Sequence, residues 1–173
     1  MRIVARLRWA PLLQAVTSLL YCAGALWLVW PVDRWSLAWA LAGFFIGWPL
    51  VEWWMHRVLF HRLFRHEHWD HHADPQGDLS VVPPIMELIL AMLFGLMVLA
   101  MGMQIGASVF SGFTLGYALY NDAHWCMHAG WWPRRGWLGA AARRHAVHHQ
   151  GIEANYNVLL PVGDWLFRTY RTG

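Results

Sequence analysis

The sequence predicts an all-α integral membrane protein, with about four transmembrane helices and a cytoplasmic helical cap that holds a histidine-rich site for two metal ions. Three observations lead to this prediction. Hydrophobic residues make up 58% of the 173 residues and charged residues only 13%, where a soluble domain has about 25% charged residues. The fourteen tryptophans are a large excess, and tryptophan favours the membrane–water interface. Eleven histidines gather in two short parts of the chain.

Four apolar stretches predict the transmembrane helices. They cover about residues 11–30, 36–55, 85–103 and 105–120. A helix of about twenty residues rises about 30 Å, enough to cross the hydrocarbon core of a bilayer. Pro31 and Asp33 mark the turn between the first two stretches, and residues around Gln104 and Gly106 separate the last two. Because the last two stretches are short, a hairpin that crosses only part of the membrane is the alternative.

The arginines orient this bundle. Every positively charged side chain is an arginine, and the formal net charge is +3. If the N-terminus is cytoplasmic, four crossings leave Arg34 as the one arginine outside, which agrees with the positive-inside rule. We therefore expect both termini and the cap, about residues 56–82 and 121–173, in the cytoplasm. Residues 1–173 then form a single multi-pass domain in the cytoplasmic membrane, such as a bacterial inner membrane.

Composition argues against other partners and other kinds of site. The arginines flank apolar runs instead of forming a basic tract, so nucleic acid is not an expected partner. Cys22 and Cys126 predict neither a disulfide framework nor a zinc ribbon. The apolar stretch after Arg8 is too long for the core of a signal peptide, so we expect no cleavable leader.

The histidines have the spacing of metal ligands on helices. Imidazole is a common ligand for transition metals, and ligands that share a helix face are three or four residues apart. Two copies of H-x-x-H-H and one H-x-x-x-H meet this rule. With two further histidines near the end of the second apolar stretch, the candidate metal ligands are His56, His61, His68, His71, His72, His124, His128, His145, His148 and His149.

Three histidines need separate comment. His56 and His61 are five residues apart, which places them on different faces of a straight α-helix. A bend or a helix end is needed to bring them together. His66 lies outside the repeated spacing, and we do not expect it to bind metal.

The number of imidazoles indicates two metal ions. Ten exceed the four ligands of one tetrahedral ion and suffice for two ions with about five each. A zinc protease motif is disfavoured, because Asp70 stands where a motif beginning at His66 needs its second histidine. The paired glutamates of soluble di-iron bundles are also missing. This donor set favours non-haem iron, a di-iron centre, with zinc as a possible substitute.

Two acids near the membrane surface are candidate supporting residues. Glu52 precedes His56 by one turn and is placed to accept its second ring N–H, as metal-bound histidine usually requires. An ion pair with Arg57 is the alternative. Asp122 precedes His124 and is a candidate for supporting that ligand or facing substrate. The neighbouring Arg143 and Arg144 are candidates for an anionic headgroup or an acidic electron donor, although a general positive-inside role is favoured.

Several longer motifs can be read around these residues. They are E-x-x-x-H-R-x-x-F-H at Glu52–His61, H-x-x-H-H at His68–His72, D-L-S-V-V-P-P at Asp78–Pro84, G-Y-x-x-Y-x-x-x-H-x-x-x-H at Gly116–His128, H-x-x-H-H at His145–His149, N-Y at Asn155–Tyr156 and D-x-x-F-x-T-Y at Asp164–Tyr170. Together they resemble the membrane fatty acid hydroxylase / sterol desaturase superfamily, and within it the catalytic domain of fatty acid 2-hydroxylases. The resemblance covers about residues 50–172.

This resemblance implies a di-iron monooxygenase that uses O2 to hydroxylate or desaturate a membrane lipid, with a fatty acyl chain as the expected substrate. It implies that the ten candidate histidines hold both metal ions. No cytochrome b5-like haem domain precedes the bundle, so we expect electrons from a separate ferredoxin-like or cytochrome b5-like protein. Asn157, Ser80 and Arg168 depart from the family pattern, which loosens the substrate assignment and not the metal site.

Two alternatives stay open. One is a carotenoid or sterol hydroxylase or desaturase of the same superfamily. Carotenoid ring hydroxylases typically show H-x-x-x-x-H where this chain has His124-x-x-x-His128. The other is a metal-handling membrane protein, such as a transporter or a sensor. It should carry histidine or aspartate near the bilayer midplane, and the first, third and fourth apolar stretches carry none centrally.

Overall fold

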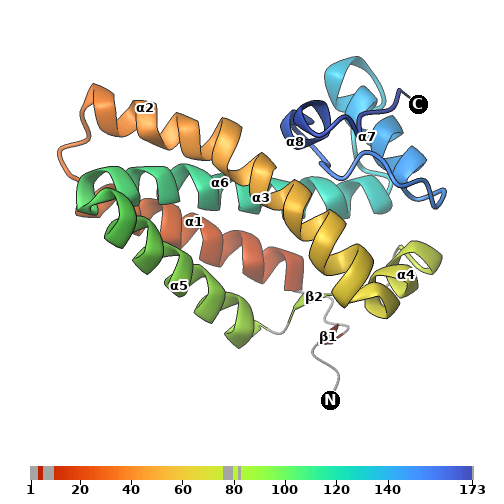
Figure 1. Cartoon of the computed structure of the whole chain (residues 1–173), viewed down its shortest axis with the longest axis horizontal. Helices are drawn as coiled ribbons and strands as arrows, with labels where there is room; N and C mark the ends of the chain where they lie inside the picture. Colours follow the sequence, from red (N-terminus) through yellow and green to blue (C-terminus); the bar gives the residue numbers. More distant parts are fainter. Residues whose placement is uncertain (1–3, 6–9, 76–79, 82, 173) are drawn as a thin grey trace. The chain divides into compact units, whose positions relative to one another are not determined.

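The computed structural model of the chain describes residues 4–5, 10–75, 80–81 and 83–172, and most of these residues are helical (Figure 1). In chain order the elements are β1 (Val4–Ala5), α1 (Ala10–Leu28), α2 (Arg34–Ala42), the π-helix η1 (Gly43–Gly47), α3 (Trp48–Trp54), the π-helix η2 (Met55–Leu63), α4 (Arg65–Ala73), β2 (Ser80–Val81), α5 (Pro83–Met101), α6 (Met103–His128), α7 (Gly136–His148) and α8 (Val162–Leu166). Within these ranges the only strands are β1 and β2, which pair antiparallel with Val4 opposite Val81. The predicted helical fold class is confirmed for the described residues.

The chain divides into two compact units. Unit 1 consists of Met1–Trp48 and Ser80–Leu119, and unit 2 consists of Pro49–Leu79 and Tyr120–Gly173. Unit 1 contains α1, α2, α5 and most of α6, whereas unit 2 contains η2, α4, α7 and α8. All ten candidate ligands belong to unit 2.

Local signals in unit 1 set the helix ends. The side chain of Asp33 accepts a hydrogen bond from the backbone N–H of Ser36 at 2.7 Å, which caps the start of α2. The turn between α5 and α6 is at Gly102, whose φ of 78° lies in the left-handed region that glycine adopts without strain. The predicted turn around Gln104 and Gly106 is therefore wrong by two to four residues, because both residues lie inside α6. Gly106 is instead a point of close approach, because a Cβ there would lie 2.6 Å from the carbonyl oxygen of Met97.

Small residues allow the backbones of α2, η1 and α6 to approach one another closely. A Cβ at Gly112 would lie 1.7 Å from the carbonyl oxygen of Ala40, and one at Gly43 would lie 2.0 Å from that of Val109. Such contacts are typical of helices that associate in a membrane, where close packing replaces the hydrophobic effect as the driving force. Phe110 and Phe113 of α6 are buried in the same unit.

One uninterrupted helical stretch in the described residues, Arg34–Leu63, is long and apolar enough to cross a membrane, by length and composition. Only 28% of the most apolar 18 residues of this stretch are buried in the structure. The shorter apolar helices are Ala15–Leu28 and Leu88–Met101. Four complete crossings therefore stay a prediction. Arg2, Arg6 and Arg8, on which the predicted orientation partly rests, and Asp78 lie outside the described residues.

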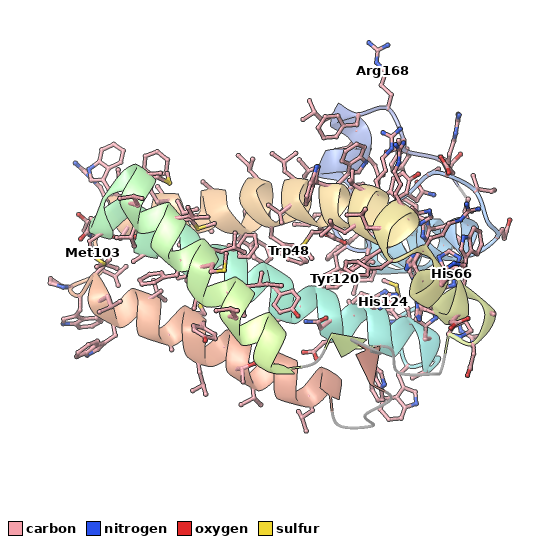
Figure 2. All side chains as sticks on the ribbon, turned by 60° about the horizontal axis from the view of Figure 1, so that its bottom comes forward. Trp48, His66, Met103, Tyr120, His124 and Arg168 are labelled. Carbon is pink, nitrogen blue, oxygen red and sulfur yellow. The ribbon has the colours of Figure 1, made fainter. Side chains whose placement is uncertain are left out.

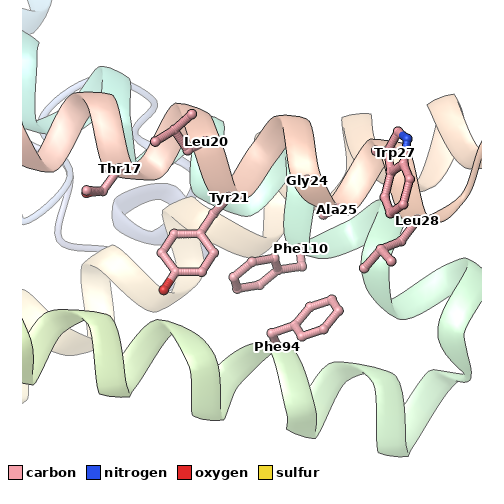
Figure 3. Close-up of a pocket in the computed structure, with 9 residues that line it drawn as sticks. All are labelled: Thr17, Leu20, Tyr21, Gly24, Ala25, Trp27, Leu28, Phe94 and Phe110. Carbon is pink, nitrogen blue, oxygen red and sulfur yellow. The ribbon is translucent and has the colours of Figure 1, made fainter.

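Unit 1 also has an open, apolar cavity of about 570 Å³ (Figure 3). Its lining comes from α1, α5 and α6, and it includes Leu20, Tyr21, Trp27, Phe94 and Phe110. The rings of Phe94 and Phe110 lie 5.1 Å apart between centroids. Aromatic and aliphatic side chains dominate this wall, so the cavity suits hydrocarbon better than polar groups.

Candidate metal centre

A π-helix brings the first two candidate ligands together. His56 and His61 lie on η2, and the N–H of Phe64 at its end bonds to the carbonyl of Leu59, five residues earlier, at 2.7 Å. In a π-helix hydrogen bonds join residues five apart, so residues i and i+5 come close to sharing a face. The rings of His56 and His61 lie 5.4 Å apart between centroids. The bend that their spacing requires is therefore a widened helical turn.

Five histidines from three segments form the first cluster. Cluster 1 consists of His56, His61, His68, His72 and His148, whose potential ligand atoms all lie within 4.8 Å of one another. The η2 helix supplies two of them, α4 supplies two that are four residues apart, and the last turn of α7 supplies the fifth. This separation of four residues on α4 is the one that the sequence pattern predicts.

A second cluster lies beside the first. His71, His124, His128 and His149 have potential ligand atoms within 4.8 Å of one another. Nε2 of His145 lies 3.0 Å from Nε2 of His128, and with it the five form cluster 2. Tyr120 stacks on His124 one turn earlier on α6, with ring planes 7° apart, and Figure 2 labels both. The two clusters adjoin, because the ring of His72 stacks on that of His149 at 4.2 Å between centroids.

The contacts inside cluster 1 fit a bound cation better than hydrogen bonds. Nε2 of His68 lies 3.0–3.1 Å from the Nε2 atoms of His56, His61 and His72. One imidazole nitrogen carries at most one proton, so it cannot form a hydrogen bond with all three. Nitrogen ligands about 2.1 Å from a common metal ion lie about 3.0–3.4 Å apart at octahedral to tetrahedral angles. The donor set and its spacing therefore fit a metal ion.

Two backbone carbonyls fix the tautomers of two of these imidazoles. Nδ1 of His56 lies 2.6 Å from the carbonyl oxygen of Tyr156, and Nδ1 of His148 lies 2.8 Å from that of Ala154. A carbonyl oxygen only accepts, so each Nδ1 carries the proton and each Nε2 presents a lone pair. Both lone pairs face the interior of cluster 1, where neutral nitrogen atoms without a proton or a cation between them would repel.

Glu52 supports His56 by a different route from the predicted one. The carbonyl of Tyr156 accepts the hydrogen bond from Nδ1 of His56, so the prediction that the Glu52 carboxylate is this acceptor is wrong. Glu52 is buried, and its Oε1 accepts a hydrogen bond from the backbone N–H of Val158 at 2.7 Å. Glu52 thus binds the backbone segment around Tyr156 and Val158, and this segment in turn orients His56.

Burial keeps the imidazoles neutral. Burial first, and then the charges of neighbouring imidazoles, lower the pKa of His71 to about 3 and that of His72 to about 4. Burial also lowers the pKa of His148 to about 3, against the opposing effect of its hydrogen bond to Ala154. In cluster 2 the same cause lowers the pKa of His149 to about 2. Because metal ligation requires the neutral form, the protein environment favours binding at neutral pH.

The remaining predicted residues have different surroundings. His66 is exposed on α4, in keeping with its place outside the repeated spacing (Figure 2). Asp122 is exposed on α6, and partial desolvation raises the pKa of its carboxyl group. Arg143 is exposed, whereas Arg144 is buried and donates to the carbonyl of Leu159 at 2.9 Å. The burial of Arg144 argues against its candidate contact with a headgroup or an electron donor, and the favoured positive-inside role stays a prediction.

Several supporting residues were given no role by the sequence pattern. Asn155, Asn157 and Asp164 are each fully buried, and Thr169 donates a hydrogen bond to Asp164. Asn155, Asp164 and Thr169 belong to the two motifs that follow His149 in the sequence, but those motifs gave them no individual role. Fully buried polar residues in a segment without regular structure are a signal of a constrained loop, but burial is not visible in the sequence.

Comparison with known proteins adds independent findings. The family model for fatty acid hydroxylases matches residues 41–169. Human fatty acid 2-hydroxylase is 29% identical over 136 residues, which cover 70% of this chain and 37% of that protein. The ceramide very long chain fatty acid hydroxylase of Schizosaccharomyces pombe is 33% identical over 148 residues, which cover 75% of this chain and 42% of that protein. The dihydroceramide fatty acyl 2-hydroxylase of Arabidopsis thaliana is 26% identical over 137 residues, which cover 72% of this chain and 57% of that protein.

A solved structure has a similar fold. The visible hydroxylase domain of full-length scs7p matches with a TM-score of 0.73 at 20% identity, covering 94% of this chain and 66% of that chain. At this identity the match speaks for the fold alone. The chain spans 37–57% of the length of the three curated relatives described above.

Proposed function

The chain belongs to the fatty acid hydroxylase family, and we propose that it is a membrane-bound di-iron monooxygenase that hydroxylates a lipid, with a fatty acyl chain as substrate. The observation that carries the proposal is the pair of adjoining histidine clusters in unit 2. Five imidazoles in each cluster supply the donors for one metal ion each, and no acidic ligand is needed. The names of three similar proteins support the proposal, because they are a fatty acid 2-hydroxylase, a dihydroceramide fatty acyl 2-hydroxylase and a ceramide very long chain fatty acid hydroxylase.

The proposed metal ligands are the ten histidines of clusters 1 and 2. Two iron ions, when bound, would supply the oxidising power from O2 that hydroxylation of an unactivated C–H bond requires. The protein's own part is to hold the imidazoles neutral, to fix their tautomers and to keep them in a buried site. Zinc stands higher than iron in the general affinity order, so it is expected to compete during overexpression.

The proposed setting is the bilayer surface. We place the metal centre on the cytoplasmic side, after four crossings, so that a substrate dissolved in the membrane reaches it from the hydrocarbon side. Electrons would come from a separate ferredoxin-like or cytochrome b5-like protein. A reporter fused at residue 173 should then read as cytoplasmic, and an external C-terminus would refute this topology.

The decisive experiment compares lipids and metals in matched cells. Cells that express the chain should gain fatty acids heavier by one oxygen atom, and growth under ¹⁸O2 should label that oxygen. Cells that express His148→Ala, which removes a cluster 1 nitrogen, should lack this product at equal protein level. Loss of two hydrogens instead of gain of oxygen would indicate a desaturase. Bound metal with unchanged lipids would favour a metal-handling protein and refute the proposal.

A further inference from the structure

One buried loop contacts two ligands of cluster 1. This segment, the acceptor loop, consists of Ala154–Val158 between α7 and α8, and all five residues are buried. Its carbonyl groups at Ala154 and Tyr156 accept from Nδ1 of His148 and Nδ1 of His56. Asn155, between them, has a φ of 55°, a left-handed conformation that asparagine tolerates better than most residues. The position of these two carbonyls sets where both Nε2 atoms point.

Asp164 holds the acceptor loop from one side. Its Oδ1 accepts the backbone N–H of Tyr156 at 2.9 Å, and its Oδ2 accepts that of Asn157 at 3.0 Å. The hydroxyl of Thr169 donates to Oδ1 at 2.7 Å and also accepts from Nε1 of Trp53 at 2.9 Å. Asp164 is fully buried, so no water competes for these bonds.

Glu52 holds the same loop at its other end. Besides the N–H of Val158, it accepts from Nδ2 of Asn157 at 3.2 Å, and that amide also donates to the carbonyl of Pro49 at 2.7 Å. Oδ1 of Asn157 accepts the backbone N–H of Asp164 at 3.1 Å. Two buried carboxylates thus bind three successive backbone N–H groups, those of residues 156, 157 and 158.

Both histidines that this loop orients belong to cluster 1. Cluster 2 is built differently, on side chains from α4, α6, α7 and the residue that caps the end of α7, with Tyr120 stacked on His124. We infer that Asp164 and Glu52 are positioning residues for one of the two metal ions: they fix the acceptor loop, the loop aims His56 and His148, and occupancy of cluster 1 depends on them while occupancy of cluster 2 does not. This inference rests on the proposed two-metal site.

The test counts metal ions in the full-length purified protein. Asp164→Asn keeps the shape of the side chain but replaces one acceptor oxygen with an NH2 group that faces a backbone N–H. Its retention of one of two metal ions against a chelator should weaken by about 10–100-fold, the usual effect of losing such a supporting contact. Glu153→Gln, an exposed carboxylate next to the loop, is the matched control and should retain both ions.

Double variants identify the ion that is lost. Asp164→Asn combined with His148→Ala should retain as much metal as His148→Ala alone, because both act on cluster 1. Asp164→Asn combined with His128→Ala should lose both ions. Thr169→Val removes one hydrogen bond to Asp164, so it should weaken metal retention less than Asp164→Asn does. It can replace Asp164→Asn in both double variants. Thr169→Ser keeps the hydroxyl group and should retain both metal ions.

The outcomes separate the proposed two-metal function from the proposed positioning role of Asp164 and Glu52. If the parent protein does not bind two ions, the proposed two-metal function fails. If the parent binds two ions and folded Asp164→Asn retains both as firmly, or releases both together, the positioning role is wrong. If Asp164→Asn does not fold, Thr169→Val decides by the same criteria, with helical circular dichroism as the check on folding.

Discussion

A glycine contact in unit 1 allows a sharp test of the packing described here. In Gly112→Ala the new Cβ would lie 1.7 Å from the carbonyl oxygen of Ala40 and 2.9 Å from the backbone nitrogen of Phe44. An ordinary contact begins at 3.4 Å, so α2 and α6 would have to separate by about 1.7 Å at this point. Both opposing atoms belong to backbone and cannot rotate away. The cost of overpacking should therefore reach the upper part of its usual range, about 3 kcal/mol.

Gly95→Ala is the matched control for this substitution. Gly95 also lies inside a helix, α5, and among the described residues no atom lies within 4 Å of its Cβ position. Replacing an unconstrained helical glycine with alanine should stabilise the fold by about 0.5–1 kcal/mol. The unfolding free energies of the two variants, measured by denaturant titration in mixed micelles, should then differ by about 3–4 kcal/mol. Equal stabilities would show that α2 and α6 do not pack through Gly112.

Three further predictions concern the metal centre and the polar contacts of unit 1. His71→Ala should abolish product formation and lower metal content, whereas His66→Ala, at an exposed position, should keep both near parental levels; similar losses in the two would require a different set of ligands. Removing the metal with a chelator should reduce the hydrogen-exchange protection of unit 2 more than that of unit 1, and added zinc should restore it, because metal binding and folding are coupled. Ser36→Ala removes the acceptor that Gln104 contacts at 2.6 Å, and micelle titration should show a loss of about 1 kcal/mol; an unchanged stability would mean that solvent replaces this bond.

The spacing of the histidines was the most informative signal in the sequence. All ten histidines chosen from it lie in the two clusters, and His66, which was set aside, is exposed. Their role as metal ligands stays a prediction. Spacing succeeds here because α4, α6 and α7 are regular helices, in which separations of three and four residues translate directly into a shared face. It cannot succeed for His56 and His61, because nothing in the sequence of Met55–Leu63 specifies a π-helix.

Contacts made by the backbone were beyond the reach of the sequence. The acceptors for His56 and His148 are the carbonyl groups of Tyr156 and Ala154, and every residue has a carbonyl group. The glutamate one turn before His56 was therefore the natural candidate, although it binds the loop instead. Charge was also a poor guide to burial. Arg144 is buried and Arg143 beside it is exposed, although both are arginines next to each other in the sequence.

The position of the buried acids follows from how each ligand is supported. A histidine on a helix takes its backbone position from the helix, but the direction of its ring depends on what its second nitrogen contacts. For His56 and His148 that contact is a loop without the hydrogen bonds of a helix or sheet, so the loop needs other partners to keep one shape. Asp164 and Glu52 provide them by accepting from successive backbone N–H groups. Burying two carboxylates is costly unless they are fully hydrogen-bonded, and these bonds offset that cost. The concentration of buried polar residues around cluster 1 is thus explained by the need to aim two ligands from an irregular segment.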